Sequence, residues 1–79
     1  MVKYERIRFD NKTVILRDSH EVEFMGTKCL SGIEVNNEGE EVASRGVDER
    51  KHIIELSLIT KRTSLVMNNH YGILEQSKS

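Results

Sequence analysis

Three histidines and one cysteine are the residues of this chain that could bind a metal ion or attack a substrate. Imidazole and thiolate are the ligands that zinc prefers. Neighbouring members of the set His20, Cys29, His52 and His70 stand 9 to 23 positions apart, without the close pair typical of zinc sites. Cys29 adjoins Leu30 in an apolar stretch, which favours packing over nucleophilic catalysis. We therefore predict no metal site, no cofactor and no catalytic residue.

A second group of chemically capable side chains is the charged run between residues 45 and 51. Its acids and lysine, Asp48-Glu49-Arg50-Lys51, have the composition of a metal-dependent nuclease site. Such a site needs a further carboxylate on a neighbouring strand and space for two metal ions and DNA, for which this chain is too short. A mixed charge run of this kind is typical of a solvated loop that a partner can contact.

Arginine and tyrosine side chains near the N-terminus form the third group. Tyr4, Arg6, Arg8 and Arg17 fall on one predicted hairpin, and such residues stack on bases, bind phosphates and anchor protein interfaces. Three acids of the same hairpin, Glu5, Asp10 and Asp18, dilute the positive charge. Together with the charged run and the turn at 68–71, the candidate partner-binding residues are Tyr4, Arg6, Arg8, Arg17, Arg45, Asp48, Glu49, Arg50, His70 and Tyr71.

Length and composition limit what can position these groups. The chain has 79 residues, with 12 Lys and Arg against 13 Asp and Glu, so its net charge of −1 selects no partner by charge alone. We predict one compact domain over residues 1–76 and a frayed tail at 77–79. A core of this size stabilises weakly, so we expect a homodimer. One cysteine, no secretory leader and no membrane-spanning apolar run indicate a soluble cytoplasmic protein without membrane contact.

Alternating apolar residues and turn signals predict a chain of short strands. Residues 2–9 and 13–16 form a hairpin around Asp10-Asn11-Lys12, and a turn at Asp18-Ser19-His20 precedes a strand over 22–24. Gly26 separates this strand from the next, at 27–35, which ends at the turn Asn36-Asn37-Glu38-Gly39. Residues 40–44 then return as a short strand.

The segment at 47–59 fits either a short helix or a strand. Acids at 48 and 49 suit a helix start, whereas His52, Ile54, Leu56 and Leu58 share one face at period two, which favours a central strand. A third hairpin is predicted with Lys61-Arg62-Thr63-Ser64 leading into the strand 65–67. The turn at 68–72 precedes a last short strand at 73–74.

Part of the first half has a family resemblance. Val14-Ile15-Leu16-Arg17-Asp18 followed by Val22-Glu23-Phe24-Met25-Gly26 resembles the rhythm of the first two strands of Sm-like RNA-binding barrels. The resemblance covers Val14 to Gly26, and a first segment that is a strand rather than a helix departs from it. It assigns no functional residue to this chain.

These patterns predict a mostly β fold, a small antiparallel curled sheet or barrel of five to seven short strands, with a short helix within 47–59 as an alternative. We expect a non-catalytic interaction module, such as a small adaptor, regulator or inhibitor. It would bind another protein through strand edges and charged loops. The alternative is a small β-barrel that binds nucleic acid.

Overall fold

The computed structural model describes residues 2–42 and 51–77, which form one antiparallel sheet of six strands that does not close into a barrel. In sheet order the strands are β4-β3-β2-β1-β5-β6. The elements are β1 (Tyr4–Phe9), β2 (Lys12–Phe24), β3 (Thr27–Val35), β4 (Lys51–Glu55), the 3-10 turn η1 (Leu56–Leu58), β5 (Ile59–Asn68) and β6 (Ile73–Gln76). The predicted mostly β fold with five to seven strands is confirmed.

Two-residue turns build the first two hairpins. Asp10 and Asn11 both have positive φ angles, of 46° and 58°, and Met25 and Gly26 have φ angles of 50° and 78°. Two successive residues with positive φ give the tight turn whose twist matches that of paired strands. Asp, Asn and Gly adopt this conformation most readily, so local turn chemistry sets the register of β1 with β2 and of β2 with β3.

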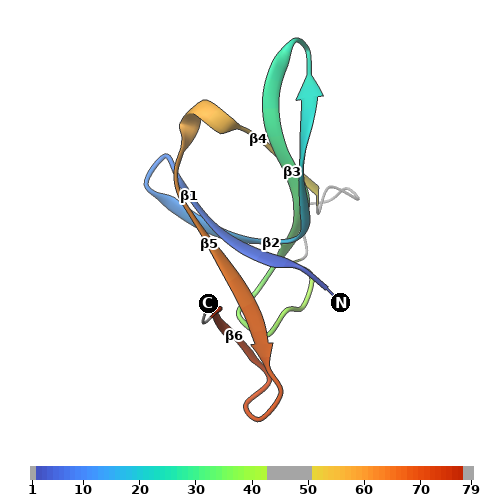
Figure 1. The fold of residues 1–79 in the computed structure, drawn as a ribbon, viewed down its shortest axis with the longest axis vertical. Coiled ribbons are helices and arrows are strands. Elements are labelled where there is room, and N and C mark those ends of the chain that lie inside the picture. Colours follow the sequence, from blue (N-terminus) through green and yellow to red (C-terminus); the bar gives the residue numbers. More distant parts are fainter. Residues whose placement is uncertain (1, 43–50, 78–79) are drawn as a thin grey trace.

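The sheet curls strongly, and η1 joins β4 to β5 across the open side (Figure 1). The concave inner face carries the main core, in which Ile7, Leu16, Leu30 and Ile54 are buried. Phe9, Val14, Leu56 and Ile59 pack against this cluster. Burial of these side chains is the main stabilising contribution available to so small a sheet.

A second apolar cluster lies on the opposite, outer face. Its buried members are Ile15, Val35, Leu65 and Leu74, with Tyr4 and Met67 packed against them. The turn at 36–40 lies over this cluster, because a Cβ at Gly39 would be 2.9 Å from Cε of Met67 and 3.2 Å from the hydroxyl of Tyr4. The turn is also tied to β6, since the N–H of Leu74 donates to the carbonyl of Asn37 at 2.6 Å.

The predicted turn at Asp18-Ser19-His20 is wrong. These residues lie inside β2 as a bulge, where Asp18 has a φ of 55° and the pairing with β3 shifts between Arg17 and His20. A bulge places two residues opposite one and reverses which alternate residues face inward. Opposite the bulge is Gly32, where an added Cβ would be only 2.9 Å from Cβ of Leu16. The two segments that resemble an Sm-like pair of strands are thus the two halves of one strand.

The predicted third hairpin is also wrong. Lys61 to Ser64 contain no turn, and β5 runs unbroken from Ile59 to Asn68 beside β1. Nor is the strand that contains His52 a central one, since β4 stands at the edge of the six-stranded sheet. Of the segment in which a helix was the alternative, residues 51–55 form β4 and 56–58 form one 3-10 turn, while 47–50 lie outside the described residues.

The other turn predictions are confirmed. Asn36 accepts hydrogen bonds at its side-chain oxygen from the N–H groups of Glu38 and Glu40, and Asn68 does the same for His70 and Tyr71. Of the predicted strand at 40–44, the described residues contribute one bridge, between Val35 and Glu41.

Candidate functional site

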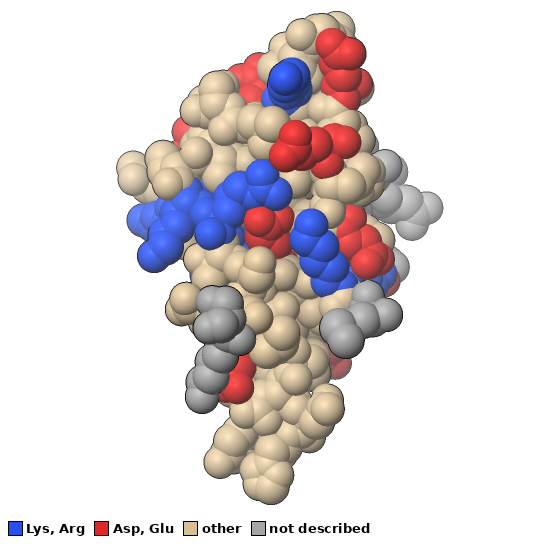
Figure 2. All heavy atoms as spheres, viewed as in Figure 1, with Lys and Arg blue, Asp and Glu red and all other residues tan. Residues whose placement is uncertain are grey.

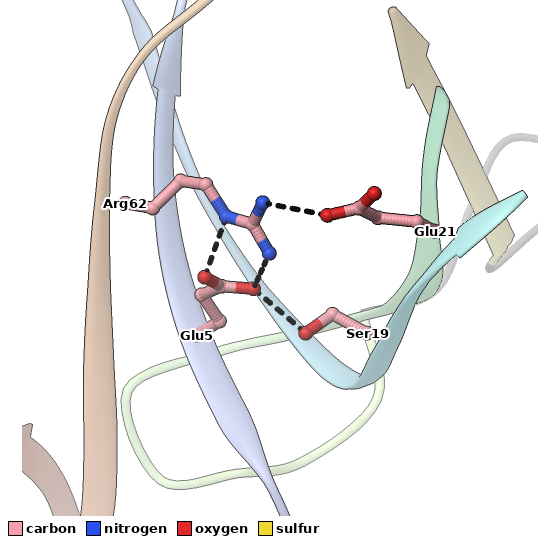
Figure 3. A network of polar contacts seen from close by, with 4 residues as sticks. All are labelled: Glu5, Ser19, Glu21 and Arg62. Carbon is pink, nitrogen blue, oxygen red and sulfur yellow. Dashed lines mark hydrogen bonds and ion pairs between the residues drawn. The ribbon is translucent and has the colours of Figure 1, made fainter. Parts of the chain in front are cut away.

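A partly buried ion pair crosses the inner face beside the main core (Figure 3). Glu5 of β1 is 7% exposed and accepts two hydrogen bonds from Arg62 of β5, with Nε 2.7 Å from Oε2 and Nη2 3.1 Å from Oε1. The Ser19 hydroxyl, in the bulge of β2, donates to Oε1 of Glu5 at 2.8 Å. Glu21 stands 3.6 Å from the Arg62 Nη1. The network joins three strands.

Charge and hydrogen bonding shift both pKa values in this network. Burial raises the pKa of Glu5, but the hydrogen bonds from Arg62 and Ser19, with the charges of Arg62 and Lys3, outweigh burial and lower it below its ordinary value of 4.5. The hydrogen bond to Glu5 raises the pKa of Arg62, against the opposing effect of burial. Both groups are therefore charged at neutral pH and satisfy each other, which is the arrangement expected of a structural pair rather than of an acid-base catalyst.

The outer face of the same two strands carries unpaired cations. Arg6 and Arg8 of β1 lie opposite Thr63 and Lys61 of β5, so all four side chains share this face. In residues 2–42 and 51–77, neither Arg6 nor Lys61 forms a hydrogen bond or ion pair through its side chain, and the Arg8 guanidinium bonds only to the hydroxyl of Thr13. Figure 2 shows Lys and Arg gathered over the β1–β2 hairpin and the start of β5.

Two other members of the predicted arginine and tyrosine cluster have structural partners. Arg17 shares the outer face with Tyr4, but its Nη2 lies 2.9 Å from Oε2 of Glu41 and its Nε 3.7 Å from Asp18. Tyr4 is half-buried against the outer cluster. The structure therefore brings Arg6 and Arg8 together as predicted and commits Arg17 and Tyr4 to contacts within the chain.

The far end of the β5–β6 hairpin is uncharged. Residues 63–74 contain no Lys, Arg, Asp or Glu, and this end of the molecule bears no charged side chain in Figure 2. Tyr71 is 72% exposed, Val66 46% and Ile73 39%. A hollow of about 440 Å³ is lined by Val66 together with Val2, Tyr4, Met67 and Asn69. The predicted residues His70 and Tyr71 lie in the turn between β5 and β6, with their rings edge to face at 5.0 Å.

The histidines and the cysteine lie apart from one another. His52 contacts the Glu34 carboxylate at 2.7 Å, His20 lies 3.0 Å from the carbonyl of Asp18, and Cys29 is buried. No group of three His, Cys, Asp or Glu that could hold a metal ion occurs in the described parts of the chain. Arg45, Asp48, Glu49 and Arg50 lie outside the described residues, so the charged run is not placed.

Sequence reasoning missed two features of these surfaces. Lys61 joins Arg6 and Arg8 only because β5 pairs with β1, and no local pattern indicates that pairing. The uncharged stretch at 63–74 is visible in the sequence, since 32% of the whole chain is charged, and it would have identified the uncharged end.

No helix among residues 2–42 and 51–77 has the length and apolar character needed to cross a bilayer. No protein-family model matches the chain, and neither a curated protein nor a solved structure is significantly similar to it.

Proposed function

We propose that this protein is a non-catalytic interaction module that binds another protein through the uncharged end of the β5–β6 hairpin. The observation that carries the proposal is the exposure of Val66, Tyr71 and Ile73 within 63–74, a stretch without Lys, Arg, Asp or Glu, with Val66 also lining a hollow. Apolar and aromatic side chains grouped in this way are typical of the centre of a protein interface. An adaptor, regulator or inhibitor acts through such a surface.

The turn that carries the aromatic pair is held in shape. Asn68 accepts hydrogen bonds from the N–H groups of His70 and Tyr71, and the Gly72 N–H donates to the carbonyl of Asn68 at 2.7 Å. A turn whose backbone is already held in its bound conformation loses little conformational entropy when the partner arrives. Tyr71 is thus suited to act as an anchor residue.

The partner would bind through side chains rather than by extending the sheet at β6. The N–H of Leu74 points away from β5 and already donates to the carbonyl of Asn37. Addition of a strand needs a row of free N–H and C=O groups along the edge. At β6 one of the few such groups is already used, whereas the exposed side chains are free to pack.

The compartment and the assembly belong to the same proposal. A single buried cysteine without a disulfide partner fits the reducing cytoplasm. Two copies meeting through the uncharged end would form the homodimer expected from the small core. Sedimentation of the purified protein would show whether this surface joins two copies or awaits a different protein.

A capture experiment with matched variants tests the proposed surface. Tagged wild type, Tyr71→Asp and Met25→Asp would be incubated with nuclease-treated lysate of the source organism. Met25 is 89% exposed at the β2–β3 turn, so its variant introduces the same charge at a side chain more accessible than Tyr71. We expect wild type and Met25→Asp to retain the same proteins in stoichiometric amounts and Tyr71→Asp to lose them. Equal retention by all three, or none above an empty tag, would refute the proposal.

A further inference from the structure

The outer face of β1 and β5 presents a row of positive charge. Arg6 and Arg8 are two residues apart on one strand, and Lys61 lies directly opposite Arg8. Two residues of a strand span about 7 Å, and directly opposed Cβ atoms lie about 5 Å apart. The three cations therefore occupy neighbouring positions on one face.

The cations of this row repel one another without compensation. Like charges placed directly opposite across two strands destabilise a sheet. The acid nearest in sequence, Glu5, points to the inner face, where it bonds Arg62 and Ser19. Within the described parts of the chain, no acidic side chain forms an ion pair with Arg6, Arg8 or Lys61. An anion bound here would relieve that repulsion, so binding energy is available at this position.

The row borders a recess with additional hydrogen-bond donors. A hollow of about 180 Å³ is lined by Arg6, Arg8, Thr13, Lys61 and Thr63. The Arg8 Nη1 donates to the hydroxyl of Thr13, another lining residue, at 2.8 Å, which restrains the guanidinium at the hollow. Guanidinium and ammonium groups beside hydroxyls are the donors that bind phosphate oxygens in proteins.

We propose that Arg6, Arg8 and Lys61 form a binding site for the phosphates of a single-stranded nucleic acid lying along β1. The spacing of Arg6 and Arg8 along the strand is close to that of successive phosphates in an extended nucleic-acid strand, so each arginine meets a separate phosphate. Lys61 and the hydroxyls of Thr13 and Thr63 hold the same phosphates from the side. The site lies on a different surface from the uncharged end and does not depend on the protein-binding proposal.

Salt-dependent binding of defined probes tests this site. The probes are fluorescein-labelled oligo(U) and oligo(dT) of about 12 nucleotides, a length within the footprint of small β domains. Binding is followed by fluorescence anisotropy with the full chain. Neutralisation of two phosphates predicts a slope of about −1.4 for log K against log salt concentration, or a loss of about 7-fold between 50 and 200 mM salt. No measurable binding of either probe at 50 mM salt would overturn the proposal.

Single neutral substitutions identify the residues. We expect Arg8→Gln and Lys61→Gln each to weaken binding about tenfold and to reduce the salt slope by about 0.7. Lys28→Gln makes the same charge change at an exposed side chain of β3 and should bind as wild type does. Circular dichroism of each variant confirms that the sheet is intact.

Three further results would contradict the assignment. Equal weakening by Lys28→Gln would show attraction to net charge rather than a site. Full competition by inorganic phosphate at low millimolar concentration would show a pocket for one phosphate rather than a strand of them. Heparin provides the last such result. If heparin binds the wild type and the Arg8→Gln variant equally and neither oligonucleotide binds, a nucleic-acid site is excluded.

Discussion

The two faces of the β1–β5 pair use charged residues in opposite ways. On the inner face, Glu5 and Arg62 are joined by two hydrogen bonds, and the carboxylate is almost fully buried. On the outer face, Arg6, which follows Glu5, and Lys61, which precedes Arg62, have no partner in the described parts of the chain. The difference arises because alternate side chains of a strand point to opposite faces.

Burial explains why one set of charges is paired and the other is not. A charge taken out of water costs several kcal/mol unless a partner and hydrogen bonds compensate for it, so the inner carboxylate needs Arg62 and Ser19. Water solvates the outer cations, which therefore need no acid to remain charged. Adjacent charged residues in one strand thus serve the fold on one side and remain available to a ligand on the other.

The largest effect on stability is expected from removal of the inner arginine. Arg62→Met would leave Glu5 buried with only the Ser19 hydroxyl as partner, and should lower the free energy of unfolding by about 2–3 kcal/mol. The value is below that for a fully buried pair because the Arg62 side chain is 35% exposed. Urea denaturation measures it.

The neighbouring residue supplies the control for that experiment. Lys61→Met removes the same charge on the outer face and should change the free energy of unfolding by less than about 0.5 kcal/mol. If Arg62→Met lowers the free energy of unfolding no more than Lys61→Met does, the inner pair does not stabilise the sheet.

Acid should weaken the inner pair selectively. Because the folded-state pKa of Glu5 lies below its ordinary value of 4.5, its stabilising contribution is complete above that pH. As pH falls through the folded-state pKa, Glu5 is protonated and that contribution is lost. We expect the free energy of unfolding of Glu5→Gln to fall less steeply than that of wild type below pH 4.5. The exposed control Glu38→Gln should follow the wild-type curve, and parallel curves for all three would exclude this role for Glu5.

A smaller effect is expected at the bulge. Ser19→Ala removes one hydrogen bond to the buried Glu5 carboxylate and should cost about 1 kcal/mol. Ser57→Ala, at an exposed position of η1, makes the same chemical change and should be neutral. If the two variants unfold at the same urea concentration, the bulge does not contribute to the ion pair.

Local patterns correctly predicted the turns at Asp10-Asn11, at Gly26, at 36–39 and at 68–72. Asp10-Asn11 and Gly26 occupy the positive φ positions of two hairpin turns, and Asn36 and Asn68 bond the backbone of the turns that they begin. These outcomes depend on a few consecutive residues, so the sequence contains the needed information. The strand over 27–35 was predicted with the observed bounds for the same reason.

Local patterns failed where contacts with distant segments determine the conformation of a residue. Asp18 has a positive φ that suits a turn or a bulge equally, and the bulge forms because its N–H bonds the carbonyl of Lys3 and its neighbour Ser19 bonds Glu5. In the same way, residues 61–64 have turn-like polarity, yet pairing with β1 extends them into β5. A local pattern cannot indicate a hydrogen-bond partner many residues away.

The sequence by itself determined the β class, the hairpin turns and the shared face of Arg6 and Arg8, because all three follow from alternation and turn chemistry over short distances. Tertiary structure alone decided that Glu5 meets Arg62, that Lys61 joins the outer arginines, and that Arg17 is held by Glu41. Each of these contacts arises from strand pairing or chain folding that brings distant residues together. Which charges stay unpaired, and hence where a ligand can bind, is a property of that pairing.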